Sequence, residues 1–219
     1  MVEISTSLLS VKEESIKKIY DLEVAHTDYY HIDVMDGKFV EADTTKRMLE
    51  YTTQIKQVSN IPIDVHLMVQ ELEEHIENYL PFSPNRITFH YEACKNRNKV
   101  EECIKKIKEN GVKVGISIKP ETPVEDIYEF LPLVHMVLIM TVEPGKGGQS
   151  LIPETLQKIK KLHTYREEKS LDFDIEADGG INLETMSNVK KAGVDIAVVG
   201  SAIIKSEDYV EIIKKLKQI

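Results

Sequence analysis

Three short segments of the sequence each place two polar residues two positions apart, and these pairs are the strongest chemical signal in the chain. The pairs are His31 with Asp33, Asp64 with His66, and Glu176 with Asp178. Side chains alternate along a β-strand, so the members of each pair share one face. Imidazoles and carboxylates that converge from several strands are typical ligands of a divalent metal ion. A buried His–Asp hydrogen bond is the alternative interpretation, because such groups are costly to bury unpaired.

Glycine-rich loops form a second signal, and they follow the last three predicted strands. Clustered glycines let backbone N–H groups approach an anion closely, and helix N-termini add a favourable dipole. Tight strand-to-helix turns are the alternative explanation for any one of these loops. Three such loops side by side favour a phosphate site. The residues are Gly145, Gly147, Gly148, Gly179, Gly180, Gly200 and Ser201.

Methionines follow the polar pairs at the strand ends and are candidates to line the same site. Met35, Met68 and Met140 would present a soft, dry surface, although methionine is more often simple core filler. His90 also falls at a strand end, where we expect a hydrogen-bonding or packing role rather than metal ligation.

The elements that must position these residues alternate along the whole chain. Eight β-rich runs are each followed by a stretch with helical spacing, such as Val100–Asn110. Several runs are apolar nearly throughout, which is typical of parallel strands buried on both faces. An open doubly wound sheet would show the same alternation, but eight repeats favour a (β/α)₈ barrel. The expected strands are Val2–Leu8, Tyr29–Met35, Ile61–Met68, Arg86–His90, Val112–Ile118, Val134–Val142, Phe173–Ala177 and Val194–Val199.

Residues typical of helix ends agree with this division of the chain. Residues 10–13 and 122–125 both fit a capping box that starts a helix. Gly111 and Gly193 stand where helices are expected to end, and residues 206–219 read as a closing amphipathic helix. No linker divides the chain, so we expect residues 1–219 to form one domain.

Composition narrows the range of partners. The 219 residues carry 28 Lys plus Arg and 37 Asp plus Glu, a net charge of −9 that disfavours nucleic acid and anionic membranes. No apolar run reaches the ~18–20 residues of a membrane span, and the first residues lack a signal-peptide pattern, which favours the cytoplasm. Cys94 and Cys103 do not make a disulfide framework, and we expect reduced thiols.

Several of these segments, taken in order, carry a resemblance to a known family. The chain resembles the ribulose-phosphate 3-epimerase family along essentially its full length. The matching segments are Ser7-Leu8-Leu9, 31–37 with Phe39-Val40, 64–69, 88–93 without Tyr91, 140–149 without Lys146, 178–181 and 200–203. The resemblance implies a (β/α)₈ barrel of the ribulose-phosphate-binding type that interconverts D-ribulose 5-phosphate and D-xylulose 5-phosphate at C3.

The resemblance also implies a set of site residues. One divalent ion is expected, with zinc first and iron, manganese or cobalt as alternatives, held by His31, Asp33, His66 and Asp178. Asp33 and Asp178 would be the two proton-transfer groups. A homo-oligomer, either dimer or hexamer, is expected. Substrate contacts are expected from Ser7, His66, Met35, Met68, Met140, Gly145, Lys146, Gly147, Gly148, Gly179, Gly180, Gly200 and Ser201.

Some residues depart from the family pattern and keep alternatives open. Lys146 replaces an aromatic residue in the glycine loop, where we expect it to add a charge contact to the phosphate. Residues 162–178 also resemble the allulose-6-phosphate 3-epimerase branch. A sugar-phosphate lyase or decarboxylase on the same barrel is another alternative, although residues 31–36 lack the lysine of the Asp-x-Lys-x-x-Asp array that such decarboxylases use. A Schiff-base aldolase would need a buried lysine at a strand end, for which Lys119 is the one candidate. A binding protein without catalysis is the third alternative, although both aspartates and both histidines are present.

Overall fold

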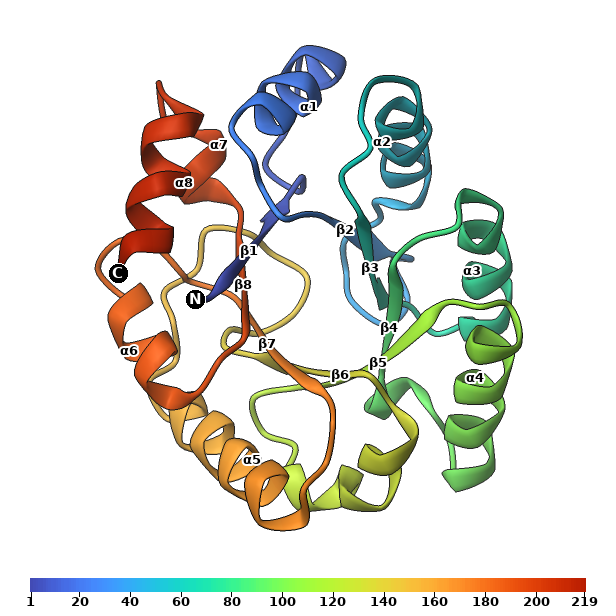
Figure 1. Ribbon diagram of the computed structural model, residues 1–219. Helices are drawn as coiled ribbons and strands as arrows, with labels where there is room; N and C mark the ends of the chain where they lie inside the picture. The colour runs from blue at the N-terminus through green and yellow to red at the C-terminus, as the bar shows by residue number, and fades with distance from the viewer.

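The computed structural model describes residues 1–219 and shows a closed barrel of eight parallel strands in sequential order, with β1 pairing both β2 and β8 (Figure 1). This confirms the predicted (β/α)₈ barrel and excludes the open sheet. Each strand lies within two residues of its predicted bounds. The strands are β1 Glu3–Ser7, β2 Tyr29–Met35, β3 Ile63–Met68, β4 Arg86–His90, β5 Lys113–Ile118, β6 Met136–Met140, β7 Asp174–Asp178 and β8 Ile196–Val199.

Helices form a ring around the barrel and cover its outer face (Figure 1). The connection between β5 and β6 is an exception, because its helix is a 3₁₀ segment that contains Pro132, which lacks the N–H that an α-helix needs. The α-helices are α1 Ser15–Val24, α2 Thr45–Val58, α3 Leu72–Tyr79, α4 Arg97–Glu109, α5 Thr155–Lys169, α6 Met186–Ala192, α7 Ser201–Ile204 and α8 Tyr209–Gln218. The 3₁₀ segments are η1 Leu80–Phe82, η2 Tyr91–Ala93 and η3 Val124–Leu133.

The main hydrophobic core lies between the strands and this helical ring. Helix α4 shows how the sequence builds it, since Val100, Cys103, Ile104 and Ile107 recur at helical spacing and all four are buried. Strand residues such as Ile32 and Val34 belong to the same 54-residue cluster, so they point toward the helices. Their neighbours His31 and Asp33 therefore point into the barrel, as the alternation of a strand requires.

Both predicted capping boxes are wrong. Helix α1 begins at Ser15, after a left-handed Glu14, and no side chain caps it. The Thr122 hydroxyl donates to Glu92 of a neighbouring connection instead of capping η3. The predictions for the carboxyl ends of helices hold better, because Gly193 takes the left-handed conformation directly after α6.

The closing helix is shorter than residues 206–219, since α8 begins at Tyr209. The Asp208 side chain caps it by accepting a hydrogen bond from the N–H of Glu211. Gly111 also has a positive φ and follows Asn110, the C-cap residue of α4.

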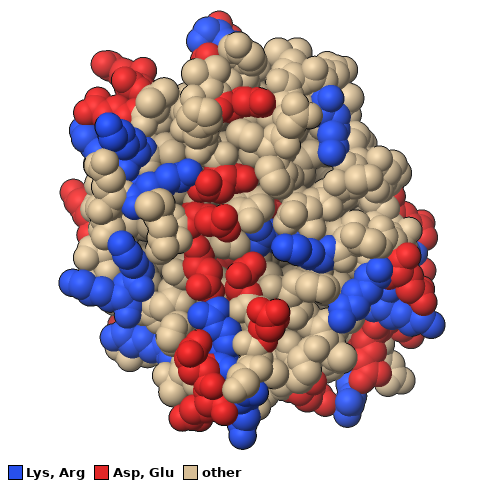
Figure 2. Space-filling model, viewed as in Figure 1, with Lys and Arg blue, Asp and Glu red and all other residues tan.

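The surface carries charges of both signs. In Figure 2 the basic side chains are interspersed with acidic ones, and acidic side chains gather over the middle of this face, without a continuous basic patch. No helix is both long enough and apolar enough to cross a bilayer. Cys94 and Cys103 are free cysteines in the structure, and their reduced state stays a prediction.

Candidate active site at the carboxyl end of the barrel

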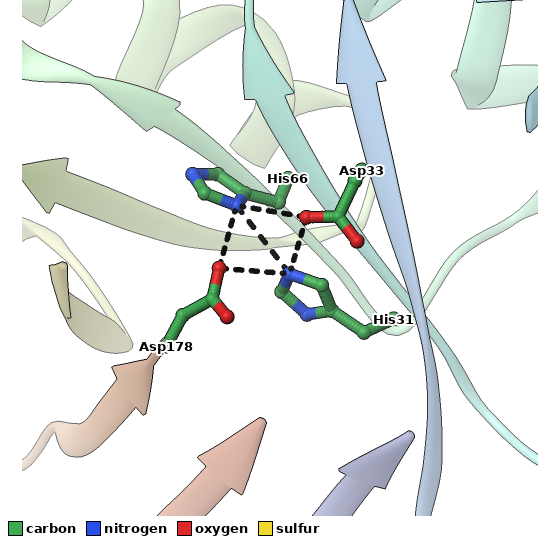
Figure 3. A group of neighbouring side chains, drawn as sticks. All are labelled: His31, Asp33, His66 and Asp178. Carbon is green, nitrogen blue, oxygen red and sulfur yellow. Dashed lines mark hydrogen bonds and ion pairs between the residues drawn. The ribbon is translucent and has the colours of Figure 1, made fainter. Parts of the chain in front are cut away.

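Strands β2, β3 and β7 bring His31, Asp33, His66 and Asp178 into one cluster. One ligand atom from each residue lies within 4.8 Å of the others (Figure 3). The register of the parallel strands explains this placement, because Asp33 on β2 pairs directly with His66 on β3. Strand β7 supplies Asp178 from the far side of the same barrel.

Each imidazole turns one nitrogen toward the cluster. His31 Nε2 lies 3.5 Å from Asp33 Oδ1 and 3.8 Å from Asp178 Oδ2. His66 Nδ1 lies 3.6 Å from Asp178 Oδ2 and 3.8 Å from Asp33 Oδ1. The two nitrogens are 3.4 Å apart, so two carboxylates and two imidazoles face one small space.

The remaining nitrogen of His31 has a different partner from the one that the sequence suggests. His31 Nδ1 lies 2.7 Å from Asp64 Oδ2, which also accepts from the Ser5 hydroxyl at 2.9 Å. The alternative of a buried His–Asp hydrogen bond is therefore present, but its carboxylate belongs to Asp64 on the next strand. Sequence spacing shows Asp64 beside His66, and only strand pairing places it opposite His31.

The remaining nitrogen of His66 faces a third histidine. His66 Nε2 lies 3.0 Å from His90 Nε2, and His90 Nδ1 lies 3.1 Å from Glu92 Oε2. His90 is fully buried and stays outside the four-residue cluster. Hydrogen bonding was the expected role of His90 over metal ligation, and this geometry agrees with it.

Burial and neighbouring charge perturb the protonation of these groups. Burial lowers the pKa of His31, but the carboxylates of Asp33 and Asp64 outweigh burial and hold that pKa well above its ordinary value. Burial raises the pKa of Asp33, and His31 and His66 more than reverse the effect. Burial lowers the pKa of His90 to about 4, so this imidazole is neutral near pH 7.

The donor set fits a divalent cation. Two imidazole nitrogens and two carboxylate oxygens are a common ligand combination for zinc and other first-row metals. The Nδ1–Asp64 contact of His31 and the Nε2–His90 contact of His66 match the outer hydrogen bonds that orient metal-ligating histidines. Without a cation, the arrangement would rest on long His–Asp contacts of 3.5–3.8 Å.

A cavity of about 250 Å³ lies directly above the cluster, with Asp33 and Asp178 in its wall. The three methionines Met35, Met68 and Met140 line it and are otherwise buried. All other residues expected to contact substrate line it too, with one exception. They are Ser7, Gly145, Lys146, Gly147, Gly148, Gly179, Gly180, Gly200 and Ser201.

His66 is that exception. Its side chain is fully buried and does not line the cavity, so its expected contact with substrate stays a prediction. Sequence reasoning missed other residues of the wall, including Leu9, Ser10 and Asn182, which lie in the loops next to the assigned ones. Their adjacency to Ser7 and Gly180 was the signal that could have found them.

The site also rests on a buried polar layer that was not expected. Arg86 is almost fully buried inside the barrel, with Nε 3.6 Å from Asp64 Oδ1 and its guanidinium 4.2 Å from the centre of the Tyr29 ring. Glu176 lies in the same layer, where burial and then the charge of Asp64 raise its pKa well above normal. Glu176 therefore belongs to the supporting layer, although it shares a strand face with Asp178.

A parallel eight-stranded barrel with its polar cluster and glycine loops at the carboxyl end is the arrangement of a (β/α)₈-barrel enzyme of the ribulose-phosphate-binding type. A family model described as "Ribulose-phosphate 3 epimerase family" matches residues 3–204. The chain belongs to this family, which makes it an isomerase of the epimerase class.

Curated relatives agree over nearly the whole chain. The chain is 36% identical to the ribulose-phosphate 3-epimerase of Bacillus subtilis over 219 residues, which cover 99% of both chains. It is 36% identical to that of Methanocaldococcus jannaschii, covering 100% of this chain and 91% of the relative. The chloroplastic ribulose-5-phosphate-3-epimerase of Arabidopsis thaliana is 34% identical, covering 98% of this chain and 75% of the relative.

Solved structures at lower identity share the fold. The 3-hexulose-6-phosphate synthase from Salmonella typhimurium superposes with a TM-score of 0.70 at 15% identity, covering 99% of this chain and 97% of that chain. The thiamine phosphate pyrophosphorylase from Pyrococcus furiosus gives 0.65 at 16% identity, covering 99% and 94%. These similarities concern the barrel alone.

Proposed function

We propose that this protein is a metal-dependent epimerase that inverts C3 of D-ribulose 5-phosphate to give D-xylulose 5-phosphate. The observation that carries the proposal is the placement of Asp33 and Asp178, which enter one cavity from β2 and β7 and face each other across the two imidazoles (Figure 3). Inversion of a carbon next to a carbonyl needs one group to remove its proton and a second group on the opposite face to return one.

The two aspartates take these roles in turn. One carboxylate accepts the C3 proton and leaves an enediolate, and the other delivers a proton to the opposite face of C3. The reverse reaction exchanges the two roles. The Ser7 hydroxyl donates to Asp33 Oδ2 at 2.7 Å, which holds the Asp33 carboxylate in the cavity wall. Ser7 itself lies in the wall and is proposed to contact the substrate.

His31, Asp33, His66 and Asp178 would hold one divalent ion, with zinc proposed first and iron, manganese or cobalt as alternatives. When bound, such an ion supplies Lewis acidity that stabilises negative charge as it develops on the substrate oxygens. Asp64 and His90 fix the outward nitrogens of the two histidines, which leaves the inward nitrogens available.

The glycine loops are proposed to bind the phosphate. They follow β6, β7 and β8 and lie on one side of the cavity, where barrels often bind phosphate. Gly180 shows why glycine is needed there: its φ is +66°, and a Cβ would come within 2.2 Å of the Leu151 backbone nitrogen. The close approach of the two backbones leaves no room for a side chain there, and backbone N–H groups of these loops are proposed to bind the phosphate.

Met35, Met68 and Met140 are proposed to exclude water from the enediolate. Their side chains cover the cavity wall near Asp33 and Asp178 with apolar surface. A dry wall strengthens electrostatic interactions inside the site and limits proton exchange with solvent.

The segment that resembles the hexulose branch lies mostly away from the cavity, so it lends no support to the hexulose over the pentulose alternative. Residues 162–178 form the second half of α5, the loop after it and β7, and Asp178 alone among them lines the cavity. Arg166 in this segment donates to the Phe173 carbonyl and to Asp195, which is a structural role.

No observation favours the lyase alternative. Lys119 Nζ lies 4.5 Å from the centre of the Phe39 ring and the residue does not line the cavity, so it is not placed to form a Schiff base.

The test is epimerisation of D-ribulose 5-phosphate beside D-allulose 6-phosphate, each with added zinc and after chelation. We expect turnover of the pentulose that chelation removes and zinc restores. A preference for the hexulose would move the protein to the sister branch. Activity that survives thorough chelation would reject the metal-dependent mechanism. Dimer or hexamer formation and a cytoplasmic location stay predictions.

A further inference from the structure

A series of hydrogen bonds leads away from His66, on the side of the ring opposite the four-residue cluster. His66 Nε2 meets His90 Nε2 at 3.0 Å, and His90 Nδ1 meets Glu92 Oε2 at 3.1 Å. Figure 3 shows Nε2 of His66 pointing away from the other three residues of the cluster, while Nδ1 points toward them. Neither His90 nor Glu92 lines the cavity, so both act on the reaction only through His66.

Only one arrangement of protons satisfies the hydrogen bonds at Glu92, the far end of this series. Glu92 Oε1 accepts from the Lys119 N–H at 2.7 Å and from the Thr122 hydroxyl. A carboxylate that already accepts these two hydrogen bonds is held in place and offers its other oxygen, Oε2, as an acceptor. His90 must then carry its proton on Nδ1, where it donates to Glu92.

The tautomer of His90 determines the tautomer of His66. A neutral imidazole with its proton on Nδ1 has an acceptor at Nε2. Because His90 Nε2 faces His66 Nε2, the proton between the two rings belongs to His66. In the neutral state of His66 the unprotonated nitrogen is then Nδ1, and its lone pair is directed at Asp33, Asp178 and His31.

We propose that His90 and Glu92 are positioning residues that hold His66 in the tautomer whose Nδ1 lone pair faces the cluster. This inference rests on the proposed metal-dependent function, since that lone pair is what a cation would use. The Glu92 contacts also tie His66 to residues 119–122, the connection directly after β5.

The two histidines of the cluster thus have different hydrogen-bond partners on their outward nitrogens. His31 donates directly to the carboxylate of Asp64, whereas His66 reaches a carboxylate only through a second imidazole. The Phe39 ring packs against that second ring with centres 4.9 Å apart, while the His66 and His90 rings meet edge to edge with centres 5.1 Å apart.

The direct test is the tautomeric state of the imidazoles in the intact protein. Long-range ¹H–¹⁵N NMR spectra distinguish a protonated from an unprotonated ring nitrogen. We expect His66 protonated at Nε2 and His90 protonated at Nδ1 in the zinc-loaded enzyme. His90 protonated at Nε2 would overturn the proposal without any substitution.

Variants test the same proposal through metal affinity. In the Glu92→Gln variant the amide can turn its NH₂ toward His90, which places the His90 proton on Nε2 against His66. In His90→Leu the acceptor is lost. We expect zinc affinity, measured by competition with a chromophoric chelator, to fall about 10–100-fold in both variants.

His90→Gln is the rescue variant, because its amide oxygen can take the place of Nε2 as the acceptor. We expect it to recover most of the affinity that His90→Leu loses. Tyr91→Phe is the matched control, since Tyr91 lies between the two residues in sequence but packs beside Phe130, with the rings 6.3 Å apart. Circular dichroism confirms that each variant is folded.

The outcomes separate this inference from the function on which it rests. If the parent protein binds none of zinc, iron, manganese and cobalt, both the proposed metal site and the positioning role of His90 and Glu92 (the relay) are overturned. A parent that binds zinc while folded Glu92→Gln and His90→Leu bind it within about twofold overturns the relay alone. Loss of affinity in Tyr91→Phe as well would show a general disturbance and also overturn it.

Discussion

Aspartates occur at both ends of the barrel strands, and the two ends use them differently. At the amino end, Asp28 precedes β2, accepts from the Ile4 N–H of β1 at 2.8 Å and pairs with Lys217. Asp195 precedes β8 in the same way, accepts from the Ile175 N–H of β7 at 2.8 Å and pairs with Arg166. Each of these carboxylates has a backbone donor and a basic partner.

At the carboxyl end, Asp33 and Asp178 face imidazoles and a cavity, and neither forms an ion pair with lysine or arginine. The amino-end aspartates join neighbouring elements of the barrel, so they contribute to stability. The carboxyl-end aspartates keep lone pairs directed into the cavity, where a ligand can reach them. The comparison shows that the same side chain serves the fold or the site according to which partners the barrel places beside it.

Of the substitutions proposed here, Asp178→Asn should show most clearly that the carboxyl end serves activity rather than stability. The amide keeps the shape of the carboxylate but cannot transfer the proton, so we expect kcat/KM to fall by about 10²–10⁴-fold. The midpoint of thermal unfolding should change by only a few degrees, on the order of 1 kcal/mol. Steady-state kinetics and thermal unfolding measure the two effects. A variant that keeps a tenth or more of the parent activity would contradict the role of Asp178.

Asp195→Ala should show the opposite pattern. It removes the acceptor of the Ile175 N–H and the carboxylate partner of the largely buried Arg166, which keeps only its hydrogen bond to the Phe173 carbonyl and a long contact with Glu167. We expect a loss of about 1.5–3 kcal/mol in unfolding free energy and a fall of roughly 3–12 °C in the unfolding midpoint. Kinetic constants well below that midpoint should match the parent.

Glu207→Ala is the control for Asp195→Ala, because Glu207 is exposed and forms no ion pair. Its unfolding midpoint should stay close to that of the parent. If Asp195→Ala lowers kcat in the fully folded protein, the division between the two ends does not hold.

Lys146→Phe tests a smaller contribution at the carboxyl end. Lys146 lies in the cavity wall within the glycine loop, and phenylalanine removes its charge while keeping a large side chain there. An exposed charge contact is worth about 0.2–1 kcal/mol, so the Michaelis constant should rise roughly 1.4- to 5-fold. Lys191→Phe, on exposed α6 surface away from the cavity, is the control. Unchanged Michaelis constants would exclude a Lys146 contact with the phosphate.

The smallest effect concerns His135, which precedes β6 at the amino end. Its Nδ1 accepts from the Val114 N–H, and burial followed by the charges of Lys108 and Lys113 lowers its pKa, with Asp172 opposing them. The folded state therefore binds fewer protons here than the unfolded state, and stability falls as the pH drops from about 6.5 toward the lowered pKa.

His135→Asn keeps an acceptor for Val114 and removes this titration. Thermal unfolding of both proteins between about pH 7 and pH 5 should show a slightly steeper loss in the parent, with activity above that range unaffected. Parallel curves for the two proteins would show that His135 does not contribute to the pH dependence.

Periodicity was sufficient to predict the barrel because each element satisfies its own local rule. Strands such as Met136–Met140 are apolar on both faces, and helices such as Arg97–Glu109 carry one apolar stripe. Boundaries were less predictable, since Glu14 and Thr122 take conformations and partners that depend on neighbouring loops.

The candidate site was predictable in part for the same reason. Strand alternation separates Asp33 from Asp36 within one motif: Asp33 points into the barrel, while Asp36 accepts from the N–H groups of Lys38, Phe39 and Gln70. Only strand pairing could show that His31 bonds to Asp64 rather than to Asp33. The buried Arg86 gave no signal in the sequence, because a lone arginine in a strand usually has an exposed end.

The sequence alone therefore determined the order and type of the elements and which side chains face the barrel interior, because both follow from short-range periodicity. Tertiary structure decided which of those side chains meet. His66, His90 and Glu92 come from two strands and a 3₁₀ turn, and their contacts reach residues after β5. Such contacts depend on strand register and barrel closure, which join residues far apart in the chain.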